Sequence, residues 1–329
     1  MLKRFWGKQP LPASRSPSRR RRQIVSIGGW TAFFALLWVL DTPWVRSLIV
    51  RDLPEILPES ASVPLVSFQT FQSRLNPLPQ WELGVQTLMT FLRGTSPPLD
   101  DVVLLAIDDP SLDIINLVFP EELEETPILK EMQSWPWSRR VHAEAARAML
   151  DAGAEVVVFD IVFDKPSPFG EDDDRAFEEL LEDYGDRVVL GARYYLASAV
   201  AGSRDQLLLP HYANANLDVQ VGFVNVERAI DTAVYKLAAN YDLPSNLPKI
   251  PSLSEAALQA SGRQRPRIFD NEWLFYNGPA ATYATFSYQD LMVPALKQVN
   301  LRGGEVFRDR IVIVGATASI LQDFQDTPW

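Results

Sequence analysis

The chain has 329 residues, of which 31 are basic and 42 acidic, and it contains no cysteine. The lack of cysteine excludes disulfides and thiolate metal sites. Two histidines, His142 and His211, leave little for a histidine-based metal site or a general base. The acidic balance argues against a nucleic-acid partner, because phosphate binding requires clustered Lys and Arg. We therefore expect no cysteine- or histidine-bound metal, no cofactor and no nucleic-acid partner.

Charge is distributed unevenly along the chain. Residues 1–22 hold eight Lys and Arg and no acidic residue, so the remainder carries 23 basic against 42 acidic residues, a net charge of −19. Residues 24–40 are uncharged and, as a helix, reach about 26 Å, near the lower limit for crossing a bilayer. The basic cluster before them holds the N-terminus inside. We predict a cytoplasmic tail at 1–23, a transmembrane anchor at 24–44 and an acidic domain outside.

Two other interpretations of the apolar stretch stay open. A cleaved export signal, including a twin-arginine signal at residues 21–25, requires small residues after the stretch, whereas residues 37–41 are bulky. The other interpretation is that the stretch is a buried helix of a soluble protein. The basic tail is either a topology signal only or a disordered segment attracted to anionic lipid.

Residues 45–80 are proline-rich and predict an irregular connection. Helical spacing of apolar residues then predicts a helix over 81–93, ended by Gly94. Ser138 is a suitable cap for a helix over 139–151. Further helices are expected over 175–183 and 252–261, and the acidic residues 121–125 are expected to form a loop.

Short aliphatic stretches predict strands that are buried on both faces. They lie at residues 102–107, 156–162, 188–192 and 311–314, with shorter candidates at 222–226 and 273–276. Strands and helices alternate in the first half, which is typical of βαβ units. We predict an α/β fold, a mostly parallel sheet with helices on both faces, preceded by one transmembrane helix.

Eight short motifs follow one another between residues 80 and 329. They are Leu92-Arg93-Gly94; Ala106-Ile107-Asp108 with Ser111-Leu112; Trp135-Pro136-Trp137-Ser138-Arg139 with His142-Ala143; Gly153-Ala154 leading into Phe159-Asp160-Ile161-Val162-Phe163; Asp173-Asp174 with Phe177; Gly222-Phe223-Val224-Asn225; Tyr276-Asn277-Gly278-Pro279; and Val314-Gly315-Ala316-Thr317 with Asp323 and Thr327-Pro328. In this order they resemble the second type of CHASE domain, the extracellular sensory module of bacterial adenylate cyclases, histidine kinases and serine/threonine kinases.

The chain departs from this family in two places. Family members usually have an Asp-Gly pair and an Arg where this chain has residues 231–235, so a ligand role for that loop is in doubt. The family domain also continues beyond the position of Trp329 into membrane helices and a cytoplasmic output domain. The resemblance implies that residues 81–329 are an extracytoplasmic sensory domain with a truncated C-terminal end. The output cyclase or kinase is absent, and the chain itself is expected not to be an enzyme.

Four aspartates, Asp108, Asp109, Asp160 and Asp164, follow predicted strands. Ligands of open α/β sheets bind outside the carboxyl ends of strands, so these side chains could share one polar site for a small molecule or an ion. Each could instead cap the next helix or turn.

The segment around Trp137 offers a second set of candidates. Its indoles and a helix N-terminus could form a pocket wall, or they could be core packing and a helix cap. We expect Arg139 to pair with Asp173 or Asp174, and His142 to be buried rather than catalytic. The predicted ligand-binding residues are Trp137, Ser138, Arg139, His142, Asp108, Asp160 and Asp174.

The sequence thus favours a single-pass protein of the cell membrane whose outer domain senses a small-molecule or ionic signal. One alternative is an external hydrolase using Asp108 and Asp160, although no nucleophile is identifiable. Another is a non-signalling fragment that pairs with full-length relatives. A homodimer is a further candidate assembly.

Overall fold

The computed structural model describes residues 78–195, 204–214, 217, 219–238, 243, 245–263, 273–321 and 325–328. The chain divides into two units, residues 1–86 and 87–329, and the second contains the fold described below. The predicted tail and anchor at 1–44 lie outside the described residues, as does most of the predicted connection at 45–80. Within the described ranges, no helix has the length and apolar character needed to cross a membrane.

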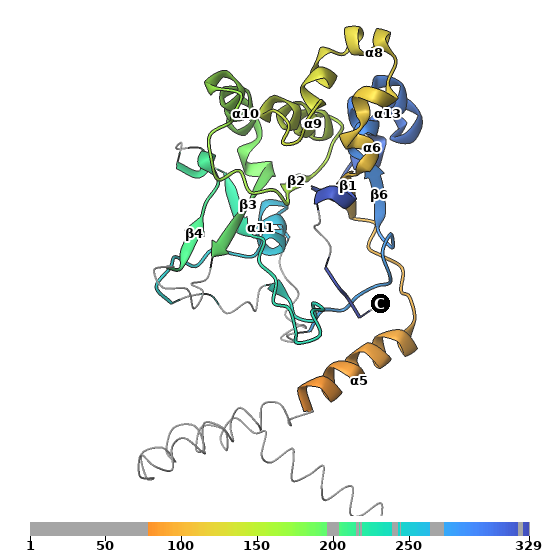
Figure 1. Cartoon of the computed structure of the whole chain (residues 1–329), viewed down its shortest axis with the longest axis vertical. Helices are drawn as coiled ribbons and strands as arrows, with labels where there is room; N and C mark the ends of the chain where they lie inside the picture. Colours follow the sequence, from red (N-terminus) through yellow and green to blue (C-terminus); the bar gives the residue numbers. More distant parts are fainter. Residues whose placement is uncertain are drawn as a thin grey trace, which may run out of the picture. The chain divides into compact units, whose positions relative to one another are not determined.

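One sheet forms the centre of the second unit. Its strands, as far as the structure describes them, are β1 (Val102–Ile107), β2 (Val156–Phe159), β3 (Val188–Tyr195), β4 (Gln206–Leu208), β5 (Gln220–Phe223), β6 (Ala284–Ser287) and β7 (Ile311–Ala316). Their order is β4-β3-β2-β7-β1-β6, and β5 also pairs with β3 (Figure 1). Only the β3–β4 pair is antiparallel. The predicted mostly parallel sheet, with the four aliphatic strands in one sheet, is confirmed.

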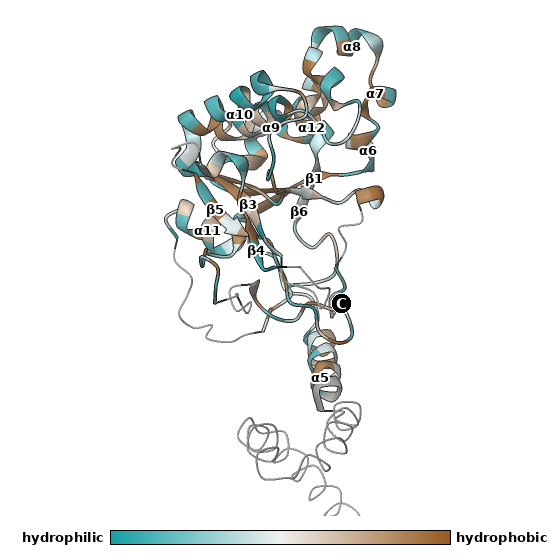
Figure 2. Cartoon of the chain, turned by 60° about the vertical axis from the view of Figure 1, so that its left-hand side comes forward, coloured by the Kyte–Doolittle hydropathy of each residue, from teal (hydrophilic) through white to brown (hydrophobic). Residues whose placement is uncertain are grey.

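The central strands are apolar on both sides because both faces of the sheet are covered. All four residues of β2 are buried. Val157 and Phe159 belong to the larger core, whereas Val156 and Val158 belong to a smaller core with Ala256 and Ala257 of helix α11. Figure 2 shows α9 and α10 on one side of the brown, apolar strands and α11 on the other. A side-chain period of two thus places alternate residues in two separate cores.

Most α-helices within the described residues lie between successive strands, whereas none of these helices separates β3, β4 and β5. They are α5 (Leu78–Arg93), α6 (Asp109–Leu112), α7 (Ile114–Leu117), α8 (Pro120–Glu125), α9 (Arg139–Asp151), α10 (Glu171–Tyr184), α11 (Leu253–Ala260), α12 (Tyr288–Met292) and α13 (Pro294–Asn300). Short 3-10 helices include η2 (Pro127–Met132), η3 (Gly185–Arg187) and η6 (Arg302–Phe307). The helices predicted at 81–93, 139–151 and 252–261 are confirmed, and α9 ends before Gly153, whose φ of 96° suits glycine.

Helix α10 begins at Glu171, four residues before its predicted start at residue 175. Its first turn consists of four acidic residues, which complement the positive end of the helix dipole, so the acidic run belongs to the helix. The acidic residues predicted as a loop at 121–125 are also helical, in α8. That helix has Pro120 in its first turn, and Glu122 accepts the N–H of Phe119 at 3.0 Å.

Two predicted strands are shorter than expected or missing. β2 ends at Phe159 rather than at residue 162, because the chain turns away where Asp160 follows it. Residues 273–276 are not a strand: Trp273 forms only an isolated bridge with Lys236. The sequence did not predict β4, β6, α12 or α13, whose short segments carry weak periodicity.

Candidate functional site

The N-terminus of α9 binds a carboxylate from the same chain. Ser138 caps the helix, with its hydroxyl oxygen 3.4 Å from the N–H of Val141. The two oxygens of Asp173 accept the N–H groups of Arg139 at 2.7 Å and of Arg140 at 2.9 Å. Asp173 is 4% exposed. The free N–H groups expected at this helix start are therefore bound to a buried side chain, and the interpretation of Ser138 as a helix cap is confirmed.

Asp174 is the second buried acid of this cluster, at 7% exposed. One oxygen accepts the N–H of Ser167 at 2.8 Å and the other accepts the hydroxyl of Tyr212 at 2.6 Å. Burial, together with the hydrogen bond to Asp174, raises the pKa of Tyr212. The pair of aspartates thus joins α10, the start of α9, the loop at residues 160–170 and Tyr212.

The predicted pairing of Arg139 with an aspartate occurs through the backbone, not through a bidentate side-chain contact. The guanidinium group donates from Nη2 to the carbonyl of Lys165 at 3.2 Å and lies 4.3 Å above the Phe163 ring. Asp173 binds the backbone rather than the guanidinium group because it is the acceptor for two N–H groups of the helix start that have no other partner. Arg139 therefore stabilises the loop at 160–170 by stacking and by hydrogen bonding.

Trp137 and His142 lie in an aromatic cluster of the core, each with a relative exposure of 1%. The His142 ring is 6.0 Å from the Trp137 ring and 5.5 Å from the Phe163 ring, centre to centre. Its Nδ1 lies 3.3 Å from the Tyr288 hydroxyl. Burial, and secondarily the charge of Arg139, lowers the pKa of His142 to about 3. The expectation of a buried histidine is confirmed, and Trp137 is part of the same buried core.

The strand-end aspartates occupy the carboxyl edge of the sheet. Asp108 caps α6, accepting the N–H of Ser111 at 3.1 Å and the hydroxyl of Ser287 at 2.8 Å. Asp109 accepts the backbone N–H of Ser319 at 2.9 Å and its hydroxyl at 3.0 Å. The capping interpretation therefore describes Asp108, and both aspartates fix segments that follow β1, β6 and β7.

Of the seven predicted ligand-binding residues, Asp160 alone is exposed. It directly follows β2, and its N–H donates to the carbonyl of Val314 in β7 at 2.9 Å. A Cβ added to Gly315 would lie 3.6 Å from the Asp160 Cβ, so the glycine leaves room beside this carboxylate. Asp164, also exposed, lies on the following loop. Among the residues that the structure describes, no three His, Asp or Glu side chains are placed to hold a metal ion.

The structure thus separates the seven predicted residues into two groups. Trp137, Ser138, Arg139, His142 and Asp174 surround the start of α9, and most of them are buried. Asp108 and Asp160 lie at the carboxyl ends of β1 and β2, on either side of β7. Sequence reasoning missed Ser167 and Tyr212, which complete the buried acid cluster. A serine seven residues before Asp174 offers no periodic signal, and Tyr212 lies in a short 3-10 helix, His211–Asn214, that the sequence did not predict.

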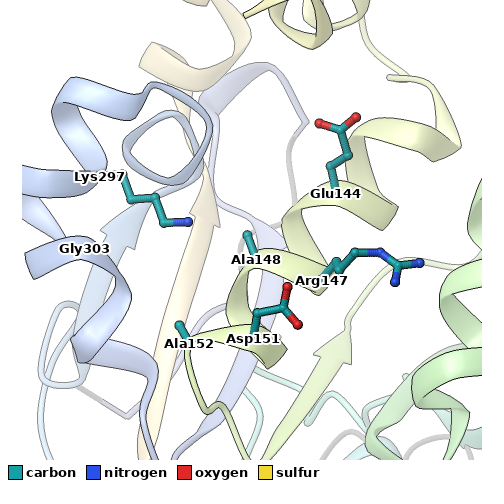
Figure 3. A pocket seen from close by; sticks show the side chains of 7 residues that line it. All are labelled: Glu144, Arg147, Ala148, Asp151, Ala152, Lys297 and Gly303. Atoms are coloured by element: carbon teal, nitrogen blue, oxygen red, sulfur yellow. The ribbon is translucent and has the colours of Figure 1, made fainter.

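A surface cavity of about 480 Å³ lies on the solvent side of α9. Figure 3 shows Glu144, Arg147 and Asp151 on that helix and the Lys297 amine reaching toward it from α13. Arg147 also binds Asp183 at 2.7 Å. Burial, and secondarily the charge of Glu131, raises the pKa of Glu144. The sequence could not indicate this cavity, because α13 was not predicted, and none of the seven predicted residues lines it.

The fold defines the class of the protein: it is an α/β domain with a mostly parallel sheet and polar residues at the carboxyl edge of the sheet. A family model for the CHASE2 domain matches residues 63–329, so the chain belongs to this family. CHASE2 domains are extracellular sensory domains. No curated protein and no solved structure matches the chain.

Proposed function

We propose that this chain is a membrane-anchored, extracytoplasmic sensory domain that binds a small molecule or an ion and biases the output of a receptor. The family match over residues 63–329 carries this proposal. Charge supports the topology: eight basic residues precede the uncharged stretch, and the rest of the chain carries a net charge of −19. In this proposal the chain supplies the sensor, and a cyclase or a kinase is the output that the sensor controls.

The ligand site that we propose is the carboxyl edge of the sheet around β2 and β7. Asp160 is exposed there, and Gly315 leaves space beside it. Arg139 borders the same edge through its contacts with Phe163 and Lys165, so a cation and an anion flank the loop at 160–170. Open α/β sheets bind ligands at this edge.

The buried candidates have a different role in this proposal. Asp174 accepts the Ser167 N–H and His142 packs against the Phe163 ring, so both hold the loop at 160–170. Ser138 caps α9, and Trp137 packs against His142. A preorganised loop keeps the ordering cost of ligand binding small. Asp108 fixes the chain at the end of β1 in a similar way, because it accepts hydrogen bonds from Ser111 and Ser287.

A thermal-shift screen of the full chain in detergent micelles tests this site. The panel contains calcium, magnesium, amino acids, polyamines and small dicarboxylates. We expect a binding compound to raise the melting temperature of the wild type and of Asp186→Ala, but not of Asp160→Ala. Asp186 is a matched control because it is an exposed aspartate just before β3, at the opposite edge of the sheet. A shift that Asp160→Ala retains in full would place the ligand elsewhere and contradict the proposed site.

A further inference from the structure

Residues 228–236 contact two parts of the domain that are far apart in the sequence. The first part is α5. The Thr87 hydroxyl and the Tyr235 hydroxyl share a hydrogen bond of 2.9 Å. Tyr235 donates its only hydroxyl proton to Asp231 at 2.8 Å, so Thr87 is the donor of the first bond. Tyr235 is buried and Thr87 is half-buried, so this link between the loop and α5 is partly shielded from water.

The second part is the segment at residues 325–328. The Val234 N–H donates to the carbonyl of Asp326 at 3.0 Å. The Thr232 hydroxyl donates to the Asp326 carboxylate at 2.5 Å. Val234 directly precedes the tyrosine that contacts α5, so the two contacts lie one peptide apart on the same backbone.

The connecting loop is closed on itself and held from a third side. The Ala229 N–H donates to the carbonyl of Ala233 at 2.9 Å, and the Thr232 N–H donates back to the Ala229 carbonyl at 3.0 Å. The Val234 carbonyl accepts the Tyr276 hydroxyl at 2.7 Å. Thr232 has a φ of 73°, a left-handed conformation that a β-branched residue adopts only when its surroundings impose it. The loop is thus restrained by hydrogen bonds within itself and to other segments of the domain.

We infer that residues 228–236 couple α5 to residues 325–328, so that loosening either contact loosens the other. The coupling is reciprocal because one loop conformation satisfies both contacts. The inference rests on the proposed function in one respect only, namely that α5 is the helix that follows the membrane anchor. The contacts themselves require neither a ligand nor a membrane, so a test of the coupling can succeed or fail independently of the sensory role.

Hydrogen–deuterium exchange of the purified full chain in detergent micelles tests the inference. Thr232→Val removes the hydroxyl that holds Asp326 and keeps the branched side chain. We expect amide exchange over residues 87–93 to rise about fivefold, since losing one hydrogen bond shifts a local opening equilibrium by about this factor. Conversely, Thr87→Val should raise exchange over residues 228–236, including the Val234 amide, by a similar factor.

Tyr184→Phe is the matched control, because it removes another tyrosine–aspartate bond, from Tyr184 to Asp151 at 2.7 Å. It should leave exchange at 87–93 and at 228–236 unchanged. Exchange over α9 serves as the internal reference, so that a rise exceeding that of α9 supports coupling even if a variant lowers global stability. A Thr232→Val effect that leaves residues 87–93 no faster than this reference would overturn the inference.

Discussion

Two groups of aspartates in this domain have opposite surroundings. Asp173 and Asp174 are almost completely buried and their carboxylates accept hydrogen bonds from two elements each. Asp108 and Asp160 follow strands at the carboxyl edge, where Asp108 is half-buried and Asp160 is exposed. The comparison shows that the position of an aspartate beside the end of a strand or helix does not by itself reveal the role of its side chain. Burial separates residues that hold the fold from residues that a ligand can reach.

The largest effect that we predict is that of Asp173→Ala. This change leaves the N–H groups of Arg139 and Arg140 without their buried acceptor, which should lower the free energy of unfolding by about 3 kcal/mol. Urea denaturation followed by circular dichroism measures it. Asp172→Ala is the control, because Asp172 is the exposed neighbour in the same helix turn and should cost about 0.5 kcal/mol. Equal losses for the two variants would show that burial does not distinguish these acids.

The second prediction concerns pH and His142. The folded-state pKa of about 3 lies below the ordinary histidine value of 6.5, so the unfolded chain takes up a proton first as pH falls. The contribution of the neutral His142 to the free energy of unfolding is therefore fully present above pH 6.5. It falls by about 1.4 kcal/mol per pH unit toward pH 3. Between pH 6.5 and pH 5, the wild type should lose about 2 kcal/mol more than His142→Leu.

Denaturation curves at these two pH values measure the difference. The interval lies above the ordinary range of carboxyl titration, and the comparison with His142→Leu cancels what the carboxyl groups contribute. His211→Gln is the matched control, because His211 is the other histidine of the chain. A slope change confined to His142→Leu assigns the effect to His142. A His142→Leu variant with an unchanged slope would contradict burial of the imidazole.

Asp108→Ala should have the smallest effect. The change removes the cap of α6 and the contact with Ser287, worth about 1 kcal/mol in total for a half-exposed carboxylate. Equilibrium unfolding of Asp108→Ala beside Asp173→Ala gives the comparison directly. If Asp108→Ala lowered the free energy of unfolding as much as Asp173→Ala, Asp108 would be a residue that stabilises the fold, which would contradict this comparison.

Much of the fold could be predicted from the sequence, and the reason lies in the central strands. Stretches such as Val102–Ile107 are apolar at every position, and only a strand covered on both faces requires this. Helix α9 carried a cap and a regular apolar stripe. In contrast, β6 and α13 are short and half-exposed, so their residues carry little periodicity, and tertiary pairing with β1 and η6 decides their structure.

The candidate site was harder to predict because it depends on contacts between distant residues. The sequence indicated that Arg139 and Asp173 meet, yet the contact uses a backbone N–H, which no side-chain pattern reveals. The buried state of His142 followed from its place beside an apolar stripe. Ser167 and Tyr212 approach Asp174 only after the loops around them fold, so no local signal marks them.

Cysteine accessibility tests the central claim, that the domain lies outside the cytoplasm, most directly. The chain has no cysteine, so a single introduced thiol has no background. Asp186→Cys places one on the exposed 3-10 helix η3 of the domain, and Lys8→Cys places one in the basic tail. With a membrane-impermeant maleimide on spheroplasts, the account predicts labelling of Asp186→Cys at once and of Lys8→Cys only after permeabilisation. Labelling of Asp186→Cys only after permeabilisation would contradict it.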